Sequence, residues 1–223
     1  MPAHHYQAII FDFDDTLVRS GRIKWAHHKA TAKEFYGLKL TDETLGKHWG
    51  MPFNDMIPLL YQHADTLENM RAANFSIEHR FRKTLQPDAL VTIKRLHAAG
   101  LPLGVLSAMT RDMIEPDIKR FGFDPSHFLF VQGSEDTPVH KPDPGVFDPA
   151  LHLLQKRGIK PQNILYVGDA LSDYYAAIGA GLHFIGVTTG FVSQAEFSSA
   201  KAKSVASLTE LLNTKLIQFP KSP

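Results

Sequence analysis

The stretch IIFDFDDTL, Ile9–Leu17, decides the fold. It starts with an apolar run, continues with three carboxylates within four positions, those of Asp12, Asp14 and Asp15, and then reaches Thr16. Such an apolar run predicts a strand that is buried on both faces of a parallel sheet. Ligands of open α/β sheets bind at the carboxyl ends of the strands, so we expect Asp12 at the ligand-binding edge. Crowded carboxylates repel one another and favour a bound cation, although an acidic turn that only closes the strand is the alternative.

Length and composition are those of an ordinary globular chain. The 223 residues are 43% hydrophobic and 21% charged, with a formal net charge of +1. This length suits one large domain, or a core domain with a small insert. The small net charge argues against a nucleic-acid surface built on bulk charge. The absence of cysteine excludes disulfides, thiolate chemistry and cysteine-type zinc sites, and it is compatible with a reducing compartment.

No targeting or membrane-spanning segment is apparent. The N-terminal residues MPAHHYQ lack an apolar signal core, and no apolar run approaches the length of a membrane span. We interpret His4 and His5 as a frayed tail rather than a metal site. The sequence therefore predicts a cytoplasmic protein with no membrane partner and no nucleic-acid partner.

Helical spacing dominates the segment from about Leu17 to Leu85. Trp25, His28 and Ala32 recur at helical intervals, and Gly37 ends that pattern. No strand is predicted in this segment, which is longer than an ordinary connection between core elements. It is therefore expected to form an inserted helical subdomain.

Beyond Pro87 the pattern alternates regularly between short apolar runs and helix-like stretches that end at glycine. This alternation indicates βαβ units, and therefore an α/β fold with a doubly wound parallel sheet. The strands are predicted at Tyr6–Phe11, Leu101–Leu106, Phe128–Val131, Ile164–Val167 and Phe184–Val187. We assign residues 1–17 and 86–223 to the α/β core, and residues 18–85 to the helical insert.

Polar residues follow the ends of several predicted strands. Ser107 follows the second strand, Lys141 ends the loop after the third, and Asp169 follows the fourth. Each has a structural explanation by itself: a turn serine, a solvated lysine and a helix N-cap. In a parallel sheet, however, they converge with Asp12 at one edge. Together they supply a nucleophile, a hydroxyl, a cation and a further carboxylate, which phosphoryl transfer from a monoester requires, and the carboxylates suit Mg²⁺.

The same residues resemble the motifs of the haloacid dehalogenase superfamily of hydrolases. The chain is similar to the phosphoglycolate phosphatase and β-phosphoglucomutase branch, in which a helical cap follows the first strand. The resemblance runs in order through nearly the whole chain. The first motif, DxDxT, matches Asp12, Asp14 and Thr16; the second, a hydroxyl, matches Ser107; the third matches Lys141 and Pro142; and the fourth, GDxxxD, matches Gly168, Asp169 and Asp173.

The resemblance implies catalytic roles. Asp12 would attack phosphorus and form an aspartyl-phosphate. Asp14 would protonate the leaving alcohol and then activate water, so its pKa is expected to be raised while Asp12 stays charged. Lys141 would bind the phosphoryl group and screen Asp12.

The resemblance also implies binding roles. Mg²⁺ would be held by Asp12, the backbone carbonyl of Asp14, Asp169 and, directly or through water, Asp173. The phosphoryl oxygens would contact Ser107, the backbone N–H of Ala108, Thr16 and Lys141.

The chain departs from the branch at two positions. Asp15 stands where glycine is usual, so either a strained turn or a positive φ is expected there. Ala108 stands where asparagine is frequent, which retains a backbone N–H but loses one side-chain contact to phosphate. These departures bear on substrate and rate more than on the type of reaction.

The cap is expected to determine specificity, because the core contacts only phosphate. Candidate residues for an anionic or polar substrate tail are Arg22, Lys24, Lys47, His48 and Trp49. Most of the charged candidates are expected to be solvated cap surface, and His48 and Trp49 are the better candidates. We interpret His27 and His28 as packing or surface residues.

The predicted function is a Mg²⁺-dependent phosphatase for a small phosphorylated metabolite, similar to phosphoglycolate phosphatase, acting as a monomer or small homo-oligomer. A phosphomutase of the β-phosphoglucomutase type is the alternative within this fold. A signalling receiver domain is disfavoured by the helical insert and by Gln132, which stands where that fold places its phosphorylated aspartate. A binding module without catalysis is the remaining alternative.

Overall fold

A parallel sheet forms the core of this protein, for which the computed structural model describes residues 6–213. Within those residues the main sheet has six strands in the order β5-β4-β1-β6-β7-β8, and every neighbouring pair is parallel. The strands are β1 (Ala8–Phe11), β4 (Leu103–Leu106), β5 (Phe130–Gln132), β6 (Ile164–Gly168), β7 (His183–Val187) and β8 (Ser204–Val205). The chain builds outward from β1 on one side and returns to its other side with β6, which confirms the doubly wound α/β fold. His4 and His5 lie outside the described residues.

The two faces of the sheet are covered by different helices. Ile9 and Phe11 point into a cluster with residues of α5, α6 and α10, whereas Ile10 points into a cluster with residues of α7, α8 and α9. This alternation explains why β1 is a continuous apolar run. The helices of the core are α5 (Ala89–Ala98), α6 (Arg111–Arg120), α7 (Asp148–Gln155), α8 (Leu171–Gly179), α9 (Gln194–Ser199) and α10 (Leu208–Asn213). Each fully buried large apolar side chain contributes roughly 1.5–3 kcal/mol to stability.

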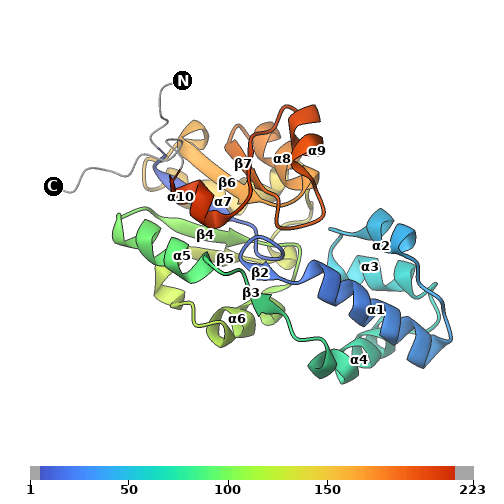
Figure 1. The fold of residues 1–223 in the computed structure, drawn as a ribbon. Helices are drawn as coiled ribbons and strands as arrows, with labels where there is room; N and C mark the ends of the chain where they lie inside the picture. Colours follow the sequence, from blue (N-terminus) through green and yellow to red (C-terminus); the bar gives the residue numbers. More distant parts are fainter. Residues whose placement is uncertain (1–5, 214–223) are drawn as a thin grey trace.

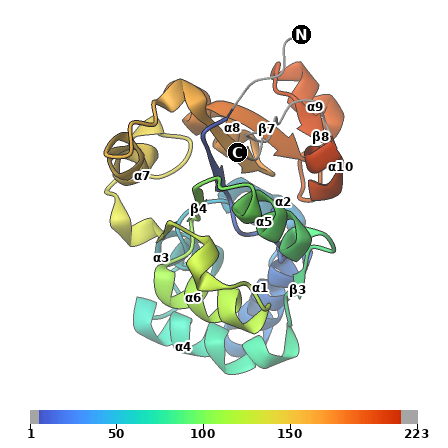
Figure 2. The ribbon, with the colours of Figure 1, turned by 90° about the vertical axis from the view of Figure 1, so that its left-hand side faces the viewer.

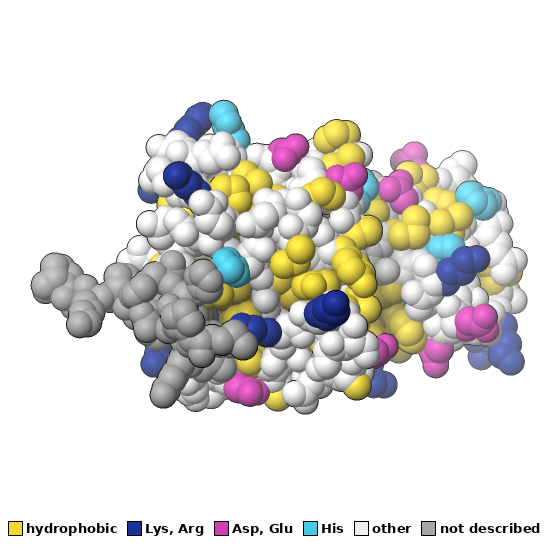
Figure 3. Space-filling view, turned by 90° about the horizontal axis from the view of Figure 1, so that it is seen from above, with side chains coloured by type: hydrophobic (Ala, Val, Ile, Leu, Met, Phe, Trp, Pro, Cys, Tyr) yellow, Lys and Arg dark blue, Asp and Glu magenta, His cyan; other side chains and the backbone are white. Residues whose placement is uncertain are grey.

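The helical insert forms a second lobe, the cap (Figure 1). Its helices are α1 (Gly21–Tyr36), α2 (Asp42–His48), α3 (Phe53–Leu60) and α4 (Leu67–Ile77). In both Figure 1 and Figure 2, α4 lies at the end of the cap farthest from β7. Viewed from above, hydrophobic side chains gather where the larger lobe meets the smaller one (Figure 3).

The prediction of no strand between Leu17 and Leu85 was wrong. β2 (Val18–Arg19) pairs antiparallel with β3 (Thr84–Leu85), so the ends of the insert are joined to each other where it leaves the core. Strands of two residues carry no readable alternation, and the partner strand is far away in the sequence. β8 also has only two residues, and for that reason the sequence did not predict it. In the described part of the chain, no helix is both long enough and apolar enough to cross a bilayer.

Candidate active site

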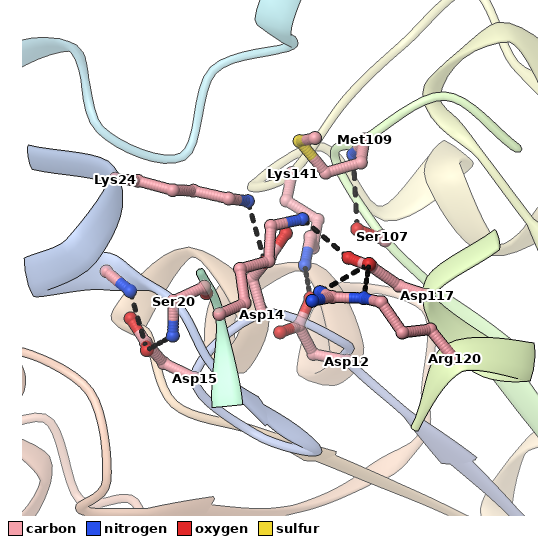
Figure 4. A network of polar contacts seen from close by, with 12 residues as sticks. Asp12, Asp14, Asp15, Ser20, Lys24, Ser107, Met109, Asp117, Arg120 and Lys141 are labelled. Carbon is pink, nitrogen blue, oxygen red and sulfur yellow. Dashed lines mark hydrogen bonds and ion pairs between the residues drawn. The ribbon is translucent and has the colours of Figure 1, made fainter. Parts of the chain in front are cut away.

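The site lies where the strand order reverses, at the carboxyl end of β1. Asp12 follows β1 directly, and its backbone N–H donates to the carbonyl of Val167 at the end of β6 (2.8 Å). Lys141 Nζ donates to Asp12 Oδ1 at 2.8 Å and to Asp173 Oδ1 at 2.6 Å (Figure 4 labels the first pair). The lysine is separated from Asp12 by 129 positions, so the fold itself creates this pair. The predicted convergence of Asp12, Lys141 and the fourth-motif acids is therefore observed.

Three buried carboxylates can share a cation. Oxygens of Asp12, Asp169 and Asp173 lie within 4.8 Å of one another. Burial raises the pKa of Asp12 to about 7, with the negative charge of Asp173 adding to the effect and Lys141 opposing it. Burial, together with Asp12 and Asp173, also raises the pKa of Asp169 well above its usual value. The crowded negative charge and the hard oxygen ligands fit a divalent cation such as Mg²⁺.

The surroundings of the two fourth-motif acids differ. Asp173 lies in the first turn of α8, where its carboxylate also accepts the backbone N–H of Ala170 at 3.0 Å. Its bond to Lys141 makes Asp173 a supporting residue as much as a cation ligand. Asp169 is approached by the loop after β7, in which a Cβ at Gly190 would collide with its carboxylate. The glycine allows this close approach, and sequence reasoning did not identify it.

Asp14 differs from the expectation. Its carboxylate pairs with Lys24 of α1 at 2.6 Å, so a cap residue contacts the first motif of the core (Figure 4). Burial acts to raise the pKa of Asp14, but Lys24 and then Lys83 outweigh it and lower that pKa to about 2. We expected a raised pKa for Asp14 and an ionised Asp12, and this order of the two pKa values is reversed in the structure. The reason is that the cap supplies a cation to Asp14, which no local sequence feature indicates.

The predicted phosphate ligands are only partly brought together. Ser107 follows β4, where its Oγ accepts the backbone N–H of Met109 at 3.1 Å, and Ala108 lines the cavity above Asp12. Thr16 is not brought to the cavity in this arrangement. Its hydroxyl is buried without a hydrogen-bond partner among the described residues, and Thr16 does not line the cavity. The turn in which Leu17 N–H donates to the Phe13 carbonyl carries this side chain inward.

Asp15 adopts the positive φ that its position demands. Its φ is 57°, and its Oδ1 accepts the backbone N–H groups of Ser20 and Gly21, both at 2.8 Å. Ser20 precedes α1 and provides no side-chain cap of its own. Asp15 therefore both tolerates the left-handed turn and caps the first cap helix, which glycine could not do.

A cavity of about 110 Å³ lies above these groups and is lined by both core and cap. Of the cap candidates, Lys24 and Trp49 line it. Arg22, Lys47 and His48 do not: Arg22 and Lys47 are exposed, and the Arg22 guanidinium lies 5.9 Å from the Phe191 ring. These three residues thus lie outside the cavity in this arrangement of the cap, and their role in specificity stays a prediction.

His27 and His28 are buried, as expected for packing residues. His27 Nε2 bonds to the Asn74 carbonyl at 2.8 Å, and His28 Nδ1 bonds to the Tyr61 hydroxyl at 2.8 Å. Both histidines also line the cavity, which the sequence did not indicate. Further lining residues that sequence reasoning missed are Met51, Phe53, Met56, Asn74, Glu78, Phe81, Lys83, Met109 and Met113. They come from separate helices and loops of the cap and the core, so no local motif indicates them.

Comparison with known proteins agrees with this geometry. A phosphoglycolate phosphatase from Yersinia pestis is 29% identical over 196 residues, covering 83% of this chain and 82% of that protein. A relative from Caldanaerobacter subterraneus, provisionally named pyrophosphatase PpaX, is 27% identical over 81% of this chain and 80% of that protein. A solved structure from Bacteroides fragilis, provisionally named a haloacid dehalogenase-like hydrolase, superposes on this chain with a TM-score of 0.77. The two are 27% identical, and the match covers 92% of this chain and 99% of that one. The family profile of haloacid dehalogenase-like hydrolases matches residues 9–187. This chain therefore belongs to the family of haloacid dehalogenase-like hydrolases.

Proposed function

We propose that this protein is a Mg²⁺-dependent phosphatase that hydrolyses a small phosphomonoester through an aspartyl-phosphate on Asp12. The observation that carries the proposal is the buried carboxylate of Asp12, held 2.8 Å from Lys141 beside two further acids at the switch point of the sheet. The names of the relatives support a phosphatase similar to phosphoglycolate phosphatase. In this proposal the protein acts in the cytoplasm as a monomer or a small homo-oligomer.

Asp12 is the nucleophile in this proposal. One of its oxygens attacks phosphorus, the bond from phosphorus to the substrate oxygen breaks, and the phosphoryl group remains on the carboxylate. Lys141 opposes the effect of burial and so favours the ionised Asp12 that attacks, and it offsets charge on the phosphoryl oxygens. Ser107 and the N–H of Ala108 border the same edge and bind the phosphoryl group.

Asp169 and Asp12 would hold Mg²⁺, with the backbone carbonyl of Asp14 and the carboxylate of Asp173 in support. The ion would supply positive charge to the phosphoryl group. The fit rests on the three clustered, buried carboxylates described above.

Asp14 moves the protons. It gives a proton to the departing alcohol and later takes one from the water that hydrolyses the aspartyl-phosphate. The carboxylate is bound to Lys24 in this structure, so that ion pair has to open before Asp14 can carry the proton. Lys24 belongs to the cap, and cap movement would therefore be coupled to proton transfer.

The test is phosphate release from ethyl phosphate and phenyl phosphate with Mg²⁺, with EDTA, and with the Asp12→Asn variant. The proposal expects release that needs the metal and is lost in the variant, with free inorganic phosphate as the product. Phosphate retained on an isomerised sugar phosphate would instead identify a phosphomutase. Release that survives in Asp12→Asn would refute the mechanism.

A further inference from the structure

The cap contributes a largely apolar wall to the cavity above the carboxylates. Its apolar members are Trp49, Met51, Phe53, Met56 and Phe81, and Met113 joins them from the core. Phe53 and Met56 are also part of the hydrophobic core of the cap, so the wall is anchored by packing. Methionine side chains adapt their shape to an apolar guest. The wall therefore favours an apolar group on the substrate.

The lysines of this wall are already paired. Lys24 Nζ lies 2.6 Å from Asp14, and Lys83 Nζ lies 2.7 Å from Asp117. Among the described residues that line the cavity, the remaining lysine is Lys141 of the phosphoryl site, and no arginine is present. As long as these pairs stay closed, a second negative group on the substrate would have to displace one of these carboxylates. It would also face Glu78, which lines the same cavity.

The histidines of the wall add hydrogen bonding without charge. Burial, and then the charge on His27, lower the pKa of His28 to about 3, and burial also lowers the pKa of His27. Asn74 Nδ2 donates to the Tyr61 hydroxyl at 2.8 Å and so completes a neutral polar network. At neutral pH these groups can orient a substrate but cannot neutralise an anion.

We propose that the substrate is the phosphomonoester of a neutral alcohol with a small apolar ring or chain, and that a second anionic group is excluded. This inference rests on the proposed phosphatase function. The cavity, about 110 Å³, also includes the phosphoryl site, so the apolar group that it admits beside the phosphate is small. The carboxylate of 2-phosphoglycolate would meet apolar side chains and paired lysines.

The first experiment compares kcat/KM with Mg²⁺ for ethyl phosphate, benzyl phosphate and 2-phosphoglycolate. All three esters place phosphate on a primary carbon, and they differ in having no tail, an apolar tail or an anionic tail. We expect benzyl phosphate to exceed each of the others by about 10-fold or more, the scale of discrimination by an apolar pocket. A kcat/KM for 2-phosphoglycolate equal to or above that for benzyl phosphate would overturn the inference.

A second measurement separates this inference from the proposed function. Calorimetric titration with benzylphosphonate and with phosphonoacetate, in the presence of Mg²⁺, reports the tail preference without hydrolysis. If none of the three esters is hydrolysed, the phosphatase proposal fails, and the order of the two dissociation constants still decides the ligand class. Tighter binding of phosphonoacetate would overturn the inference, and tighter binding of benzylphosphonate would support it.

A variant pair tests the wall directly. Trp49→Ala should lower the ratio of kcat/KM for benzyl phosphate to that for ethyl phosphate by about 10-fold, and Trp49→Phe should retain most of it. The ratio is taken within one preparation, so it is independent of the fraction of folded enzyme. An unchanged ratio in Trp49→Ala would contradict the assignment of the apolar wall to substrate binding.

Discussion

Acidification should destabilise this protein through one residue of the cavity wall, His28. Its side chain is 2% exposed, and its Nδ1 is bound to the Tyr61 hydroxyl at 2.8 Å. Burial, followed by the charge on His27, lowers the pKa of His28 to about 3 in the folded protein. In the unfolded chain a histidine titrates near its ordinary pKa of about 6.5. The unfolded state therefore binds the proton first as the pH falls, and stability is lost below about pH 6.5.

The size of this effect follows from the two pKa values. Between pH 7 and pH 5, protonation of the unfolded histidine lowers the free energy of unfolding by about 2 kcal/mol. Any folded-state pKa of His28 below about 4 gives nearly the same loss of stability at pH 5. His28→Phe removes the titrating group from a surrounding of aromatic rings, among them Trp49 and Phe53. The variant should therefore lose about 2 kcal/mol less than the wild type over this pH range.

The assay is urea unfolding of wild type and His28→Phe at pH 7 and pH 5. His79→Gln, which removes an exposed histidine of the cap, serves as the control and should keep the pH dependence of the wild type. The comparison uses differences between pH values, so the hydrogen bond lost in His28→Phe cancels. Equal pH dependence in wild type and His28→Phe would refute the reasoning, since it would mean that His28 titrates alike in folded and unfolded protein.

Three further predictions concern the site and its supports. Lys141→Met leaves Asp12 without its ion-pair partner and should lower the free energy of unfolding by about 3–5 kcal/mol in EDTA, measured in urea. Mg²⁺ at about 100 times its dissociation constant should raise the stability of the wild type by about 2.7 kcal/mol, and Asp169→Asn should reduce that gain; no gain in thermal melts would contradict the cation site. Asp15→Ala should lower the free energy of unfolding by about 1–2 kcal/mol, because it removes the hydrogen bonds at the start of α1 and disfavours the positive φ. Asp15→Asn should lower it less, and equal losses in urea unfolding would argue against a role of Asp15 in capping α1.

Much of the site was predictable because its residues sit at strand ends. Asp12, Ser107 and Asp169 each follow a buried apolar run, and parallel strands bring such positions to one edge. Lys141 ends a loop rather than a strand, and the fold brings its Nζ within 2.8 Å of Asp12 and 2.6 Å of Asp173. Thr16 lies away from the cavity because the turn that carries the motif also buries its hydroxyl.

The sequence by itself determined the doubly wound sheet, the helical insert and the acidic core of the site, because strand runs and motif spacing are local properties. Tertiary structure decided what the cap brings to them: the pairing of Lys24 with Asp14, and the apolar wall that contains Trp49. Helical periodicity shows which cap residues are buried but not which element they face. The low pKa of Asp14 depends on that facing element, since it is produced by charges from α1 and from Lys83, far apart in the chain. The cap side of the cavity therefore depends on long-range contacts, whereas the polar residues of the core lie in short sequence motifs.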